Sequence, residues 1–449
     1  MYPKIAIIGA GSGAFSLSMI RDICLTPNLR GCTVHFMDID PDRLDGVYFL
    51  TLRYAAEMGI ELDVHKTLNR QECLDGADFV INTALSAGHH RLRAGWEVAR
   101  KYGYRHGGSL AIMHDEAFWI DFYQLRLFES IVNDIIKICP KAYYLQVANS
   151  VLGGITFLSR KYPQVNMVGL CHGYNGVYHL AQVLGLDRDG LTFELPGVNH
   201  FIWLTKMYYK GVDVFPLLDR WVENDANNYF ETCSEGDDIG PKAVDLYKRF
   251  GAFHIGDTCT DGGGYWGWWY HTDRETQISW KQNPDAFWNG YFHSVDWNAK
   301  EIQRISQDQS VKVSDHFPPK HSGDTMVPLV ESLAFDIPRT YNVNVPNTGS
   351  YVPGVPTNFA VEVWGYASKR GIQAIQTGGL PPMALAYLIR DRVVPVELEL
   401  AAYANHDRKL LLELIRLDPW TRSEAQASAF LDDLLALPFH TEMREHYQD

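Results

Sequence analysis

The sequence lacks long hydrophobic runs, an excess of positive charge and low-complexity tracts. No segment approaches the roughly 18 consecutive apolar residues of a transmembrane helix, so we expect no membrane partner. The formal net charge is −14, and no stripe of lysine and arginine offsets it. Because such a charge repels a phosphate backbone, we expect no nucleic-acid partner either.

Paired cysteine motifs are also missing, and we expect no leader segment. The seven cysteines are odd in number and scattered, with no Cys-x-x-Cys pair. The N-terminus, Met1–Lys4, runs directly into a strand-like segment and leaves no room for a signal peptide. Reduced thiols and a cytoplasmic location are therefore predicted.

The composition is that of a soluble globular protein, with 46% hydrophobic and 21% charged residues. A chain of 449 residues exceeds what one hydrophobic core usually supports. From Leu191 onward aromatic strands replace the earlier alternation of strands and helices. We predict two domains, 1–195 and 196–449, without a flexible linker and with the site in the crevice between them.

A glycine-rich turn follows the first predicted strand. The apolar run Lys4–Ile8 leads into Gly-Ala-Gly-Ser-Gly-Ala at 9–14, and a helical pattern covers Phe15–Cys24. Such a turn lets the backbone approach a diphosphate, whose charge the helix N-terminus stabilises. We therefore predict that NAD binds here, in contact with Gly9, Gly11, Ser12, Gly13 and Phe15.

Polar residues end three further predicted strands of the first half. The strand at 32–37 ends in Asp38, which is placed to accept hydrogen bonds from ribose hydroxyls. The strands at 77–83 and 142–148 end at the edge where open α/β sheets bind ligands. Strands alternate with helices to about residue 190, which predicts a doubly wound parallel sheet. The added cofactor-binding candidates are Asp38, Asn82, Thr83 and Asn149.

A cysteine and a histidine end the next predicted strand. The run at 165–170 leads into Cys171-His172, and Asn199-His200 follows after another strand-like approach. Cysteine and histidine are metal ligands, and two strand ends in one domain can bring them together. The alternative is that Cys171 is a small core residue, as free cysteines often are.

The second half is rich in aromatic residues. Aromatic strands at 201–209 precede the stretch 262–297, which holds six of the chain's 12 tryptophans. Such density suits a packed subunit interface or a sugar-stacking wall, and we favour the interface. Strand segments within 343–363 and helices at 381–403 and 406–437 complete the predicted elements. A homodimer or homotetramer is the predicted assembly.

Nearly the whole chain resembles the NAD- and divalent-metal-dependent glycosidases of glycoside hydrolase family 4. Within that family it is most similar to the branch that acts on unphosphorylated α-glucosides and α-glucuronides. In this branch a histidine follows the metal-binding cysteine, as His172 does here, whereas the phosphosugar enzymes carry aspartate. The resemblance rests on the motifs at 9–12, 37–40, 77–84, 171–173, 196–200, 255–258, 418–419 and 435–447.

The resemblance implies a role for each matched position. Cys171 and His200 would bind Mn²⁺ or another divalent cation, and Asn149 would orient the substrate. Asp257 would be the base at the sugar C2, and His172 would contact the substrate and assist the leaving group as an acid. The implied fold is lactate/malate dehydrogenase-like: an N-terminal Rossmann-like doubly wound parallel sheet with a C-terminal α+β domain.

Three positions depart from the family pattern, all on the substrate side. Ser150 follows Asn149 where the family has proline, and Ser109 stands near the place of an acidic residue. Thr260 replaces an arginine, and the run Asp-Gly-Gly-Gly at 261–264 follows. These departures bear on sugar specificity.

The reaction implied by the resemblance departs from the usual two-carboxylate scheme of glycosidases. NAD⁺ would oxidise the sugar at C3, the C2 proton would be removed, the C1 group eliminated, water added and the hydride returned. A metal-free NAD-dependent dehydrogenase of a small hydroxy acid or sugar, with net oxidation, is the alternative. A non-enzymatic NAD-sensing protein is a third interpretation, which the Cys171, His200 and Asp257 set disfavours.

Overall fold

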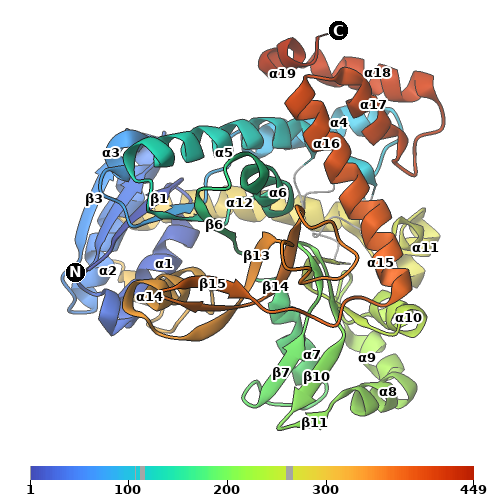
Figure 1. Cartoon of the computed structure of the whole chain (residues 1–449), viewed down its shortest axis with the longest axis horizontal. Helices are drawn as coiled ribbons and strands as arrows, with labels where there is room; N and C mark the ends of the chain where they lie inside the picture. Colours follow the sequence, from blue (N-terminus) through green and yellow to red (C-terminus); the bar gives the residue numbers. More distant parts are fainter. Residues whose placement is uncertain (1, 107, 112–116, 259–265, 449) are drawn as a thin grey trace.

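One mixed sheet runs through both halves of the chain (Figure 1). The computed structural model describes residues 2–106, 108–111, 117–258 and 266–448, and within them this sheet has 12 strands. A separate sheet of three strands lies at the lower end of the molecule in Figure 1. The long sheet positions every predicted site residue discussed below.

Six parallel strands form the N-terminal part of the long sheet, in the order β3-β2-β1-β4-β5-β6. This is the order of dinucleotide-binding doubly wound sheets, so the predicted N-terminal fold is confirmed. The edge strand β3 was missed, because its sequence DVHKT offers only one buried apolar side chain. The strands are β1 (Lys4–Ile8), β2 (Thr33–Met37), β3 (Asp63–Thr67), β4 (Phe79–Asn82), β5 (Tyr143–Gln146) and β6 (Asn166–Gly169).

Helices cover both faces of these strands, which explains the nearly continuous apolar run of β1. Alternate β1 residues enter two different cores: Ile5 and Ile7 face one, and Ala6 and Ile8 the other. The first core includes α1, α2 and α14, and the second includes α4, α5 and α6. These helices and their neighbours are α1 (Gly13–Leu25), α2 (Pro41–Glu57), α3 (Arg70–Leu74), α4 (Gly88–Lys101), α5 (Phe118–Ile138), α6 (Val151–Lys161), α7 (Gly176–Val183) and α14 (Met326–Phe335).

The second half of the chain extends the same sheet beyond β6. β13 runs antiparallel to β6, and β14, β8, β9 and β12 follow in that order. β15 pairs with β14, and β7, β10 and β11 form the small sheet. The strands are β7 (Leu191–Glu194), β8 (Gly197–Val198), β9 (Phe201–Leu204), β10 (Lys206–Tyr209), β11 (Val212–Asp213), β12 (Phe253–Ile255), β13 (Arg339–Pro346), β14 (Ala360–Ser368) and β15 (Gly371–Ala374).

The remaining helices pack on both halves of the chain. Ile302 and Ile305 of α12 belong to the core formed by α1 and α2, so a late segment completes the first domain's packing. The predicted division at residue 195 falls between β7 and β8 and stays a prediction. The helices are α8 (Phe215–Asn224), α9 (Ala226–Thr232), α10 (Pro241–Phe250), α11 (Arg274–Ser279), α12 (Pro284–Gln307), α13 (Val313–His316), α15 (Pro382–Leu388), a π-helix (Ile389–Val393), α16 (Val394–Asn405), α17 (Arg408–Arg416), α18 (Glu424–Leu435) and α19 (Thr441–His446).

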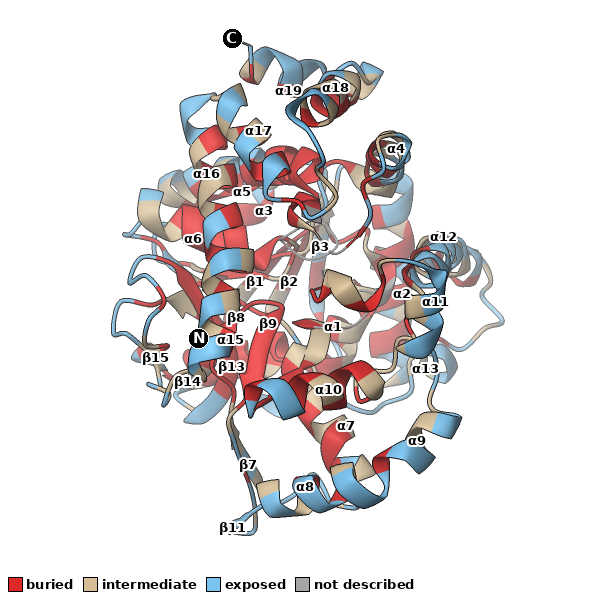
Figure 2. Ribbon diagram, turned by 90° about the vertical axis from the view of Figure 1, so that its right-hand side faces the viewer, coloured by how far each residue is buried: buried red, intermediate tan, exposed pale blue. Residues whose placement is uncertain are grey.

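The tryptophan-rich stretch is largely part of the chain's own core. Trp266 and Trp288 are 3% and 2% exposed, and Trp266 packs against the rings of Phe201 and Trp203. Figure 2 shows the same trend: β8 and β9 are drawn as buried, whereas α8 and α9 are largely exposed. For these two tryptophans the predicted interface is wrong, because the rings are buried within the chain itself. Trp297, at 56% exposed, stays available to a partner.

Among the described residues, no helix has both the length and the apolar character that a membrane crossing requires.

Gly197 tests the packing of the second half. A Cβ at this position would lie 2.1 Å from the carbonyl oxygen of Phe201 in the adjacent strand. We expect Gly197→Ala to destabilise the protein by roughly 1–3 kcal/mol or more, as overpacking does. The melting temperature should then fall by about 2–4 °C for each kcal/mol.

Gly290 is the matched control, because an added Cβ there meets nothing within 4 Å on α12. Gly290→Ala should stabilise the helix by about 0.5–1 kcal/mol. Equal melting temperatures for the two variants would contradict the packing described for β8.

Candidate metal and cofactor site

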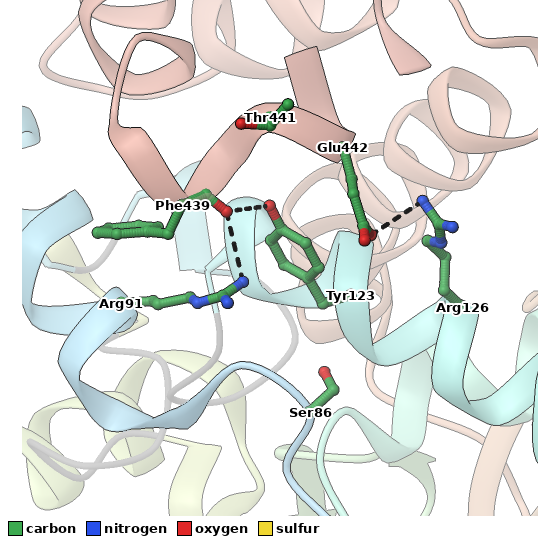
Figure 3. Close-up of a pocket in the computed structure, with 7 residues that line it drawn as sticks. All are labelled: Ser86, Arg91, Tyr123, Arg126, Phe439, Thr441 and Glu442. Atoms are coloured by element: carbon green, nitrogen blue, oxygen red, sulfur yellow. Dashed lines mark hydrogen bonds and ion pairs between the residues drawn. The ribbon is translucent and has the colours of Figure 1, made fainter. Parts of the chain in front are cut away.

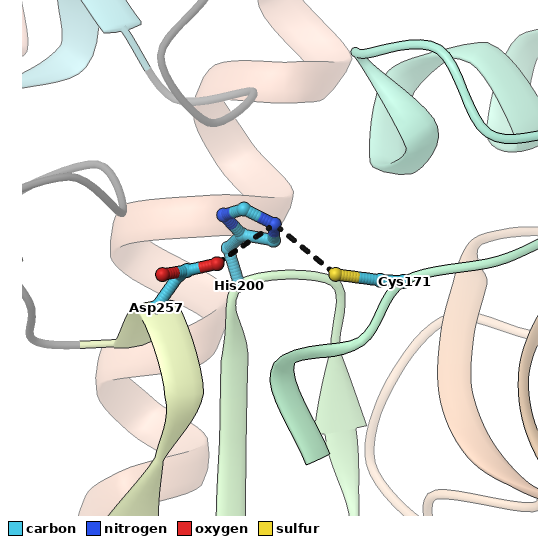
Figure 4. Close-up of side chains that lie close together, drawn as sticks. All are labelled: Cys171, His200 and Asp257. Atoms are coloured by element: carbon cyan, nitrogen blue, oxygen red, sulfur yellow. Dashed lines mark hydrogen bonds and ion pairs between the residues drawn. The ribbon is translucent and has the colours of Figure 1, made fainter. Parts of the chain in front are cut away.

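Cys171, His200 and Asp257 form a compact cluster (Figure 4). The Sγ atom of Cys171 lies 3.4 Å from Nε2 of His200, and the same nitrogen lies 3.6 Å from Oδ2 of Asp257. One ligand atom of each residue lies within 4.8 Å of the other two. The cysteine, predicted either as a ligand or as a core residue, is therefore grouped with two further donors.

Three strand ends deliver these side chains. Cys171 follows β6 by two residues, His200 occupies the turn between β8 and β9, and Asp257 lies in the 3₁₀ turn Gly256–Thr258 after β12. β12 pairs with β9, and the Thr258 hydroxyl accepts a hydrogen bond from the Ile202 amide at 2.9 Å. The turn bearing Asp257 is thus fixed to the strand that follows His200.

Two glycines, Gly173 and Gly256, allow the loops that carry Cys171 and Asp257 to touch. A Cβ on Gly256, whose φ is +56°, would lie 2.5 Å from the carbonyl oxygen of Gly173. Any larger residue at Gly256 would therefore push the two loops apart, and with them the thiol and the carboxylate.

Burial sets the protonation of the two predicted ligands. It raises the pKa of the Cys171 thiol far above its usual range, with smaller contributions from the carboxyls of Glu362 and Asp257. Burial also lowers the pKa of His200 to about 4, against the opposing effect of Asp257. His200 is therefore neutral at pH 7, as a metal-ligating imidazole must be. Sulfur, imidazole nitrogen and carboxylate oxygen together suit a divalent transition-metal ion.

A buried polar group lies next to this cluster. The carboxylate of Glu362 on β14 accepts hydrogen bonds from the amides of Asn199, at 2.9 Å, and Asn344, at 3.3 Å. Burial raises the pKa of Glu362 to about 7, although both amide hydrogen bonds oppose the rise. Glu362 and Asn344 were not predicted from the sequence; the only signal was a charged residue between the valines of an otherwise apolar strand.

The glycine loop has the conformation that its sequence predicts. Gly9 has φ +84°, and a Cβ there would lie 2.6 Å from the backbone of Ala84. The carboxylate of Asp38 accepts a hydrogen bond from the Gly11 amide at 2.7 Å, so it braces the loop. A Cβ on Gly13 would meet Ile302 of α12 at 2.7 Å, so a glycine at this position leaves room for α12 to pack against the loop. Ser12 and Phe15 are half-buried.

The other strand-end residues differ in how much of each side chain is accessible. Asn82 is fully buried and donates to the Tyr144 hydroxyl at 2.9 Å, while Thr83 donates to the backbone of β1. Asn149 is half-buried after β5, and its peptide bond to Ser150 is cis. Their predicted roles toward the cofactor and the substrate stay predictions.

His172 is exposed beside the buried cluster, so it is accessible from solvent. Ser109 is buried and donates to the carbonyl oxygen of Leu414 on α17 at 2.5 Å, which places its hydroxyl against a helix. Thr260 and the glycine run at 261–264 lie outside the described residues.

A buried arginine and a buried pair of acids also lie near the predicted site and were missed by the sequence analysis. Arg392 is 2% exposed in the π-helix, 5.2 Å from the Phe201 ring centroid, and its charge helps to lower the pKa of His200. Asp121 on α5 and Glu399 on α16 are buried together, and Ser150 lies close enough to Asp121 to affect the pKa of its carboxyl. Burial raises the pKa of both carboxyls, so the pair retains a proton near neutrality.

A cavity of about 410 Å³ lies between α4, α5 and the C-terminal segment (Figure 3). Arg91 and Tyr123 both donate hydrogen bonds to the carbonyl oxygen of Phe439, and Arg126 forms an ion pair with Glu442 at 3.2 Å. None of the predicted catalytic or metal-binding residues lines this cavity.

Two family models match the sequence in succession. The model of family 4 glycosyl hydrolases matches residues 4–186, and the model of their C-terminal domain matches residues 195–421. Together they span the strand ends that carry the cluster.

Relatives of known function are distant but match along their whole length. An α-galacturonidase of Thermoanaerobacter italicus is 24% identical, over 95% of this chain and 94% of its own. An α-galactosidase of Bacillus subtilis is also 24% identical, over 96% and 97%.

Solved structures share the fold. A 6-phospho-α-glucosidase from gut microorganisms, in complex with NAD and Mn²⁺, superposes with a TM-score of 0.78 at 17% identity, over 99% of this chain and 98% of that one. A lactate dehydrogenase of Eimeria maxima gives a TM-score of 0.53 at 14% identity, over 90% and 96%. The predicted dehydrogenase-like fold is confirmed.

The buried acid pair predicts a pH dependence of stability. A carboxyl whose pKa is raised on folding stabilises the protein below its unfolded pKa of about 4. This contribution is lost as the pH rises through the folded value, about 8 for Glu399. Glu399→Gln mimics the protonated acid. Between pH 5.5 and 8.5 its melting temperature should therefore fall less than that of the wild type, by about 2–4 °C for each kcal/mol of stability that the wild type loses over this range.

Glu397→Gln is the control, because Glu397 lies on the same helix but forms a partly exposed ion pair with Arg160. Its melting temperature should follow the wild-type pH profile. An unchanged profile for Glu399→Gln would contradict the shared proton.

Proposed function

The chain belongs to the family 4 glycosyl hydrolases, and from this premise we propose that it hydrolyses unphosphorylated α-glycosides, either an α-glucoside or an α-hexuronide. We propose further that it requires NAD and a divalent cation such as Mn²⁺. The observation that carries the proposal is the Cys171–His200–Asp257 cluster at the ends of strands in a dinucleotide-binding sheet. The curated α-galacturonidase and α-galactosidase relatives support an unphosphorylated sugar.

When NAD and the cation are both bound to the protein, the nicotinamide would accept a hydride from the sugar and the cation would polarise the neighbouring sugar oxygens. Cys171 and His200 would hold the cation, with Cys171 losing its proton on binding. The glycine loop would face the diphosphate with its backbone amides, and Asp38 would accept hydrogen bonds from the ribose.

The remaining residues would act on the sugar itself. The Asp257 side chain is 31% exposed and carries the carboxylate that would remove the proton at C2. Asn149, after β5, would orient the ring from the end of the strand adjacent to β6. The exposed imidazole of His172 would donate a proton to the leaving oxygen. Each proton therefore has a donor or acceptor within this chain.

We propose a cytoplasmic homodimer or homotetramer as the working form. Six described cysteines are free thiols, which supports a reducing compartment. Phe287 and Trp297 expose aromatic surface on α12, which supports association with a second copy.

Activity assays test the proposed reaction. The wild-type chain should cleave p-nitrophenyl α-glycosides or α-uronides only when NAD⁺ and Mn²⁺ are supplied, without accumulation of NADH. Cys171→Ser and His200→Ala should each lower kcat/KM by more than about 100-fold, because loss of the cation removes several kcal/mol of transition-state stabilisation.

Cys233→Ser removes another free thiol and should leave both activity and metal dependence intact. Full hydrolysis after chelation and cofactor removal would refute the proposal. Stoichiometric NADH would instead indicate a dehydrogenase.

Asp38 tests the cofactor site separately. Asp38→Ala removes a charged hydrogen-bond acceptor, so the Kd for NAD⁺ should rise by about 10–100-fold. Isothermal titration calorimetry with NAD⁺ measures this, and Mn²⁺ affinity should stay unchanged. Asp42→Ala is the control, because Asp42 is an exposed residue in the first turn of α2. Unaltered NAD⁺ affinity in Asp38→Ala would contradict the assigned role.

A further inference from the structure

Four residues lie in one row across the sheet where its two halves join. Gly169 on β6 is paired with Asn344 on β13, Asn344 with Glu362 on β14, and Glu362 with Gly197 on β8. Gly169 and Gly197 belong to the only register pairs by which β6 meets β13 and β14 meets β8 within the described residues. Cys171 lies two residues beyond one end of this row, and Asn199-His200 begins two residues beyond the other. The row therefore links the two strands, β6 and β8, that precede the predicted ligands.

The side chains in the middle of the row are polar and buried. Residues directly opposite in adjacent strands project from the same face of a sheet, so Asn344 and Glu362 point the same way. Their hydrogen bond, with Asn344 Nδ2 donating to Glu362 Oε2 at 3.3 Å, agrees with this geometry. Neither side chain is exposed at all. A charged side chain in so apolar a position is costly unless it has a partner or a task.

Asn199 connects this row to the ligands. Its amide donates to the same Glu362 oxygen at 2.9 Å, and its side chain lies close enough to Cys171 to lower the pKa of the thiol, against the larger effect of burial. Asn199 directly precedes His200, whose φ of +57° is uncommon for a residue other than glycine. The residue held by Glu362 therefore lies beside one predicted ligand and directly precedes the other.

The second oxygen of Glu362, Oε1, is buried and has no hydrogen-bond partner among the residues that the structure describes. Glu362 is also close enough to Cys171 to act on the thiol electrostatically. A carboxylate in this position attracts a cation bound between Cys171 and His200.

We propose that Glu362 is a positioning residue of the metal centre: together with Asn344 it clamps the Asn199 amide, which holds the Cys171 thiolate and the His200 turn in one ligating geometry. This inference rests on the proposed function, in which the cluster binds a divalent cation. Groups that orient metal ligands influence affinity without touching the ion. A purely structural role for Glu362 would instead change stability and leave the bound metal unchanged.

Metal titration separates these roles. The full-length chain is stripped of metal, saturated with NAD⁺ and titrated with Mn²⁺ while free Mn²⁺ is followed by electron paramagnetic resonance. Glu362→Gln keeps the shape but removes the charge and one acceptor, and should raise the Kd for Mn²⁺ by about 10–100-fold. An unchanged Kd would overturn the inference.

Glu331→Gln is the matched control. Glu331 is also buried and accepts from two side chains, Asn28 and Arg339, but it lies on α14 away from the row. Its loss should lower stability and leave the Kd for Mn²⁺ at the wild-type value. An equal rise in Kd for both variants would show that general destabilisation is responsible, and would overturn the inference.

Cobalt substitution reports the ligand geometry directly. Co²⁺ bound to a thiolate gives a sulfur-to-metal charge-transfer absorption band, which wild type should show and Cys171→Ser should lose. In Glu362→Gln this band should shift or weaken even at saturating Co²⁺. A band identical to wild type at saturation would overturn the positioning role.

If Glu362→Gln does not fold, Asn344→Ala provides a second test of the inference, because the hydrogen bond between Asn199 and Glu362 remains in that variant. Its Kd for Mn²⁺ should rise by less than that of Glu362→Gln, and an unchanged Kd would then overturn the inference. If the wild-type chain binds neither Mn²⁺ nor Co²⁺, the proposed function fails instead. The two failures are therefore distinguishable.

Discussion

The register by which β6, β13, β14 and β8 join is the constraint on which the site depends. Cys171 and His200 belong to different parts of the fold, which the two intervening strands, β13 and β14, join. Because strand spacing is set by backbone hydrogen bonds, these strands limit how the two predicted ligands can move relative to each other. A slip of one residue in β14 would turn Glu362 to the opposite face and separate it from Asn199.

Burial makes this arrangement suited to the proposed metal ion. The environment that keeps His200 neutral also keeps the Cys171 thiol protonated, so the cluster does not hold a permanent negative charge around its sulfur. A divalent ion reverses this balance, because it offsets the thiolate and the nearby carboxylates at once. Arg392, buried close to His200, adds the opposite charge to the same region. The predicted site therefore has both cationic and anionic neighbours before any ligand binds.

Local sequence patterns predicted those features whose cause is local. The glycine loop, Asp38 and the apolar strand β1 depend on neighbours within one βαβ unit, and each lies where the pattern placed it. Cys171 and His200 were found because both follow strand-like runs. β3 was not found, because an edge strand buries too little apolar surface to leave a pattern.

The features that were missed depend on pairing between distant segments. Glu362 contacts Asn199 across 163 positions of sequence, and nothing near either residue encodes the register that joins them. The tryptophans show the same limit, since density alone does not distinguish an interface from an interior. Trp266 fills the core because Phe201 and Trp203 of β9 meet it there. A buried charge within a valine-rich strand is the one local signal that could have directed attention to Glu362, because such a charge is kept only where it has a partner or a function.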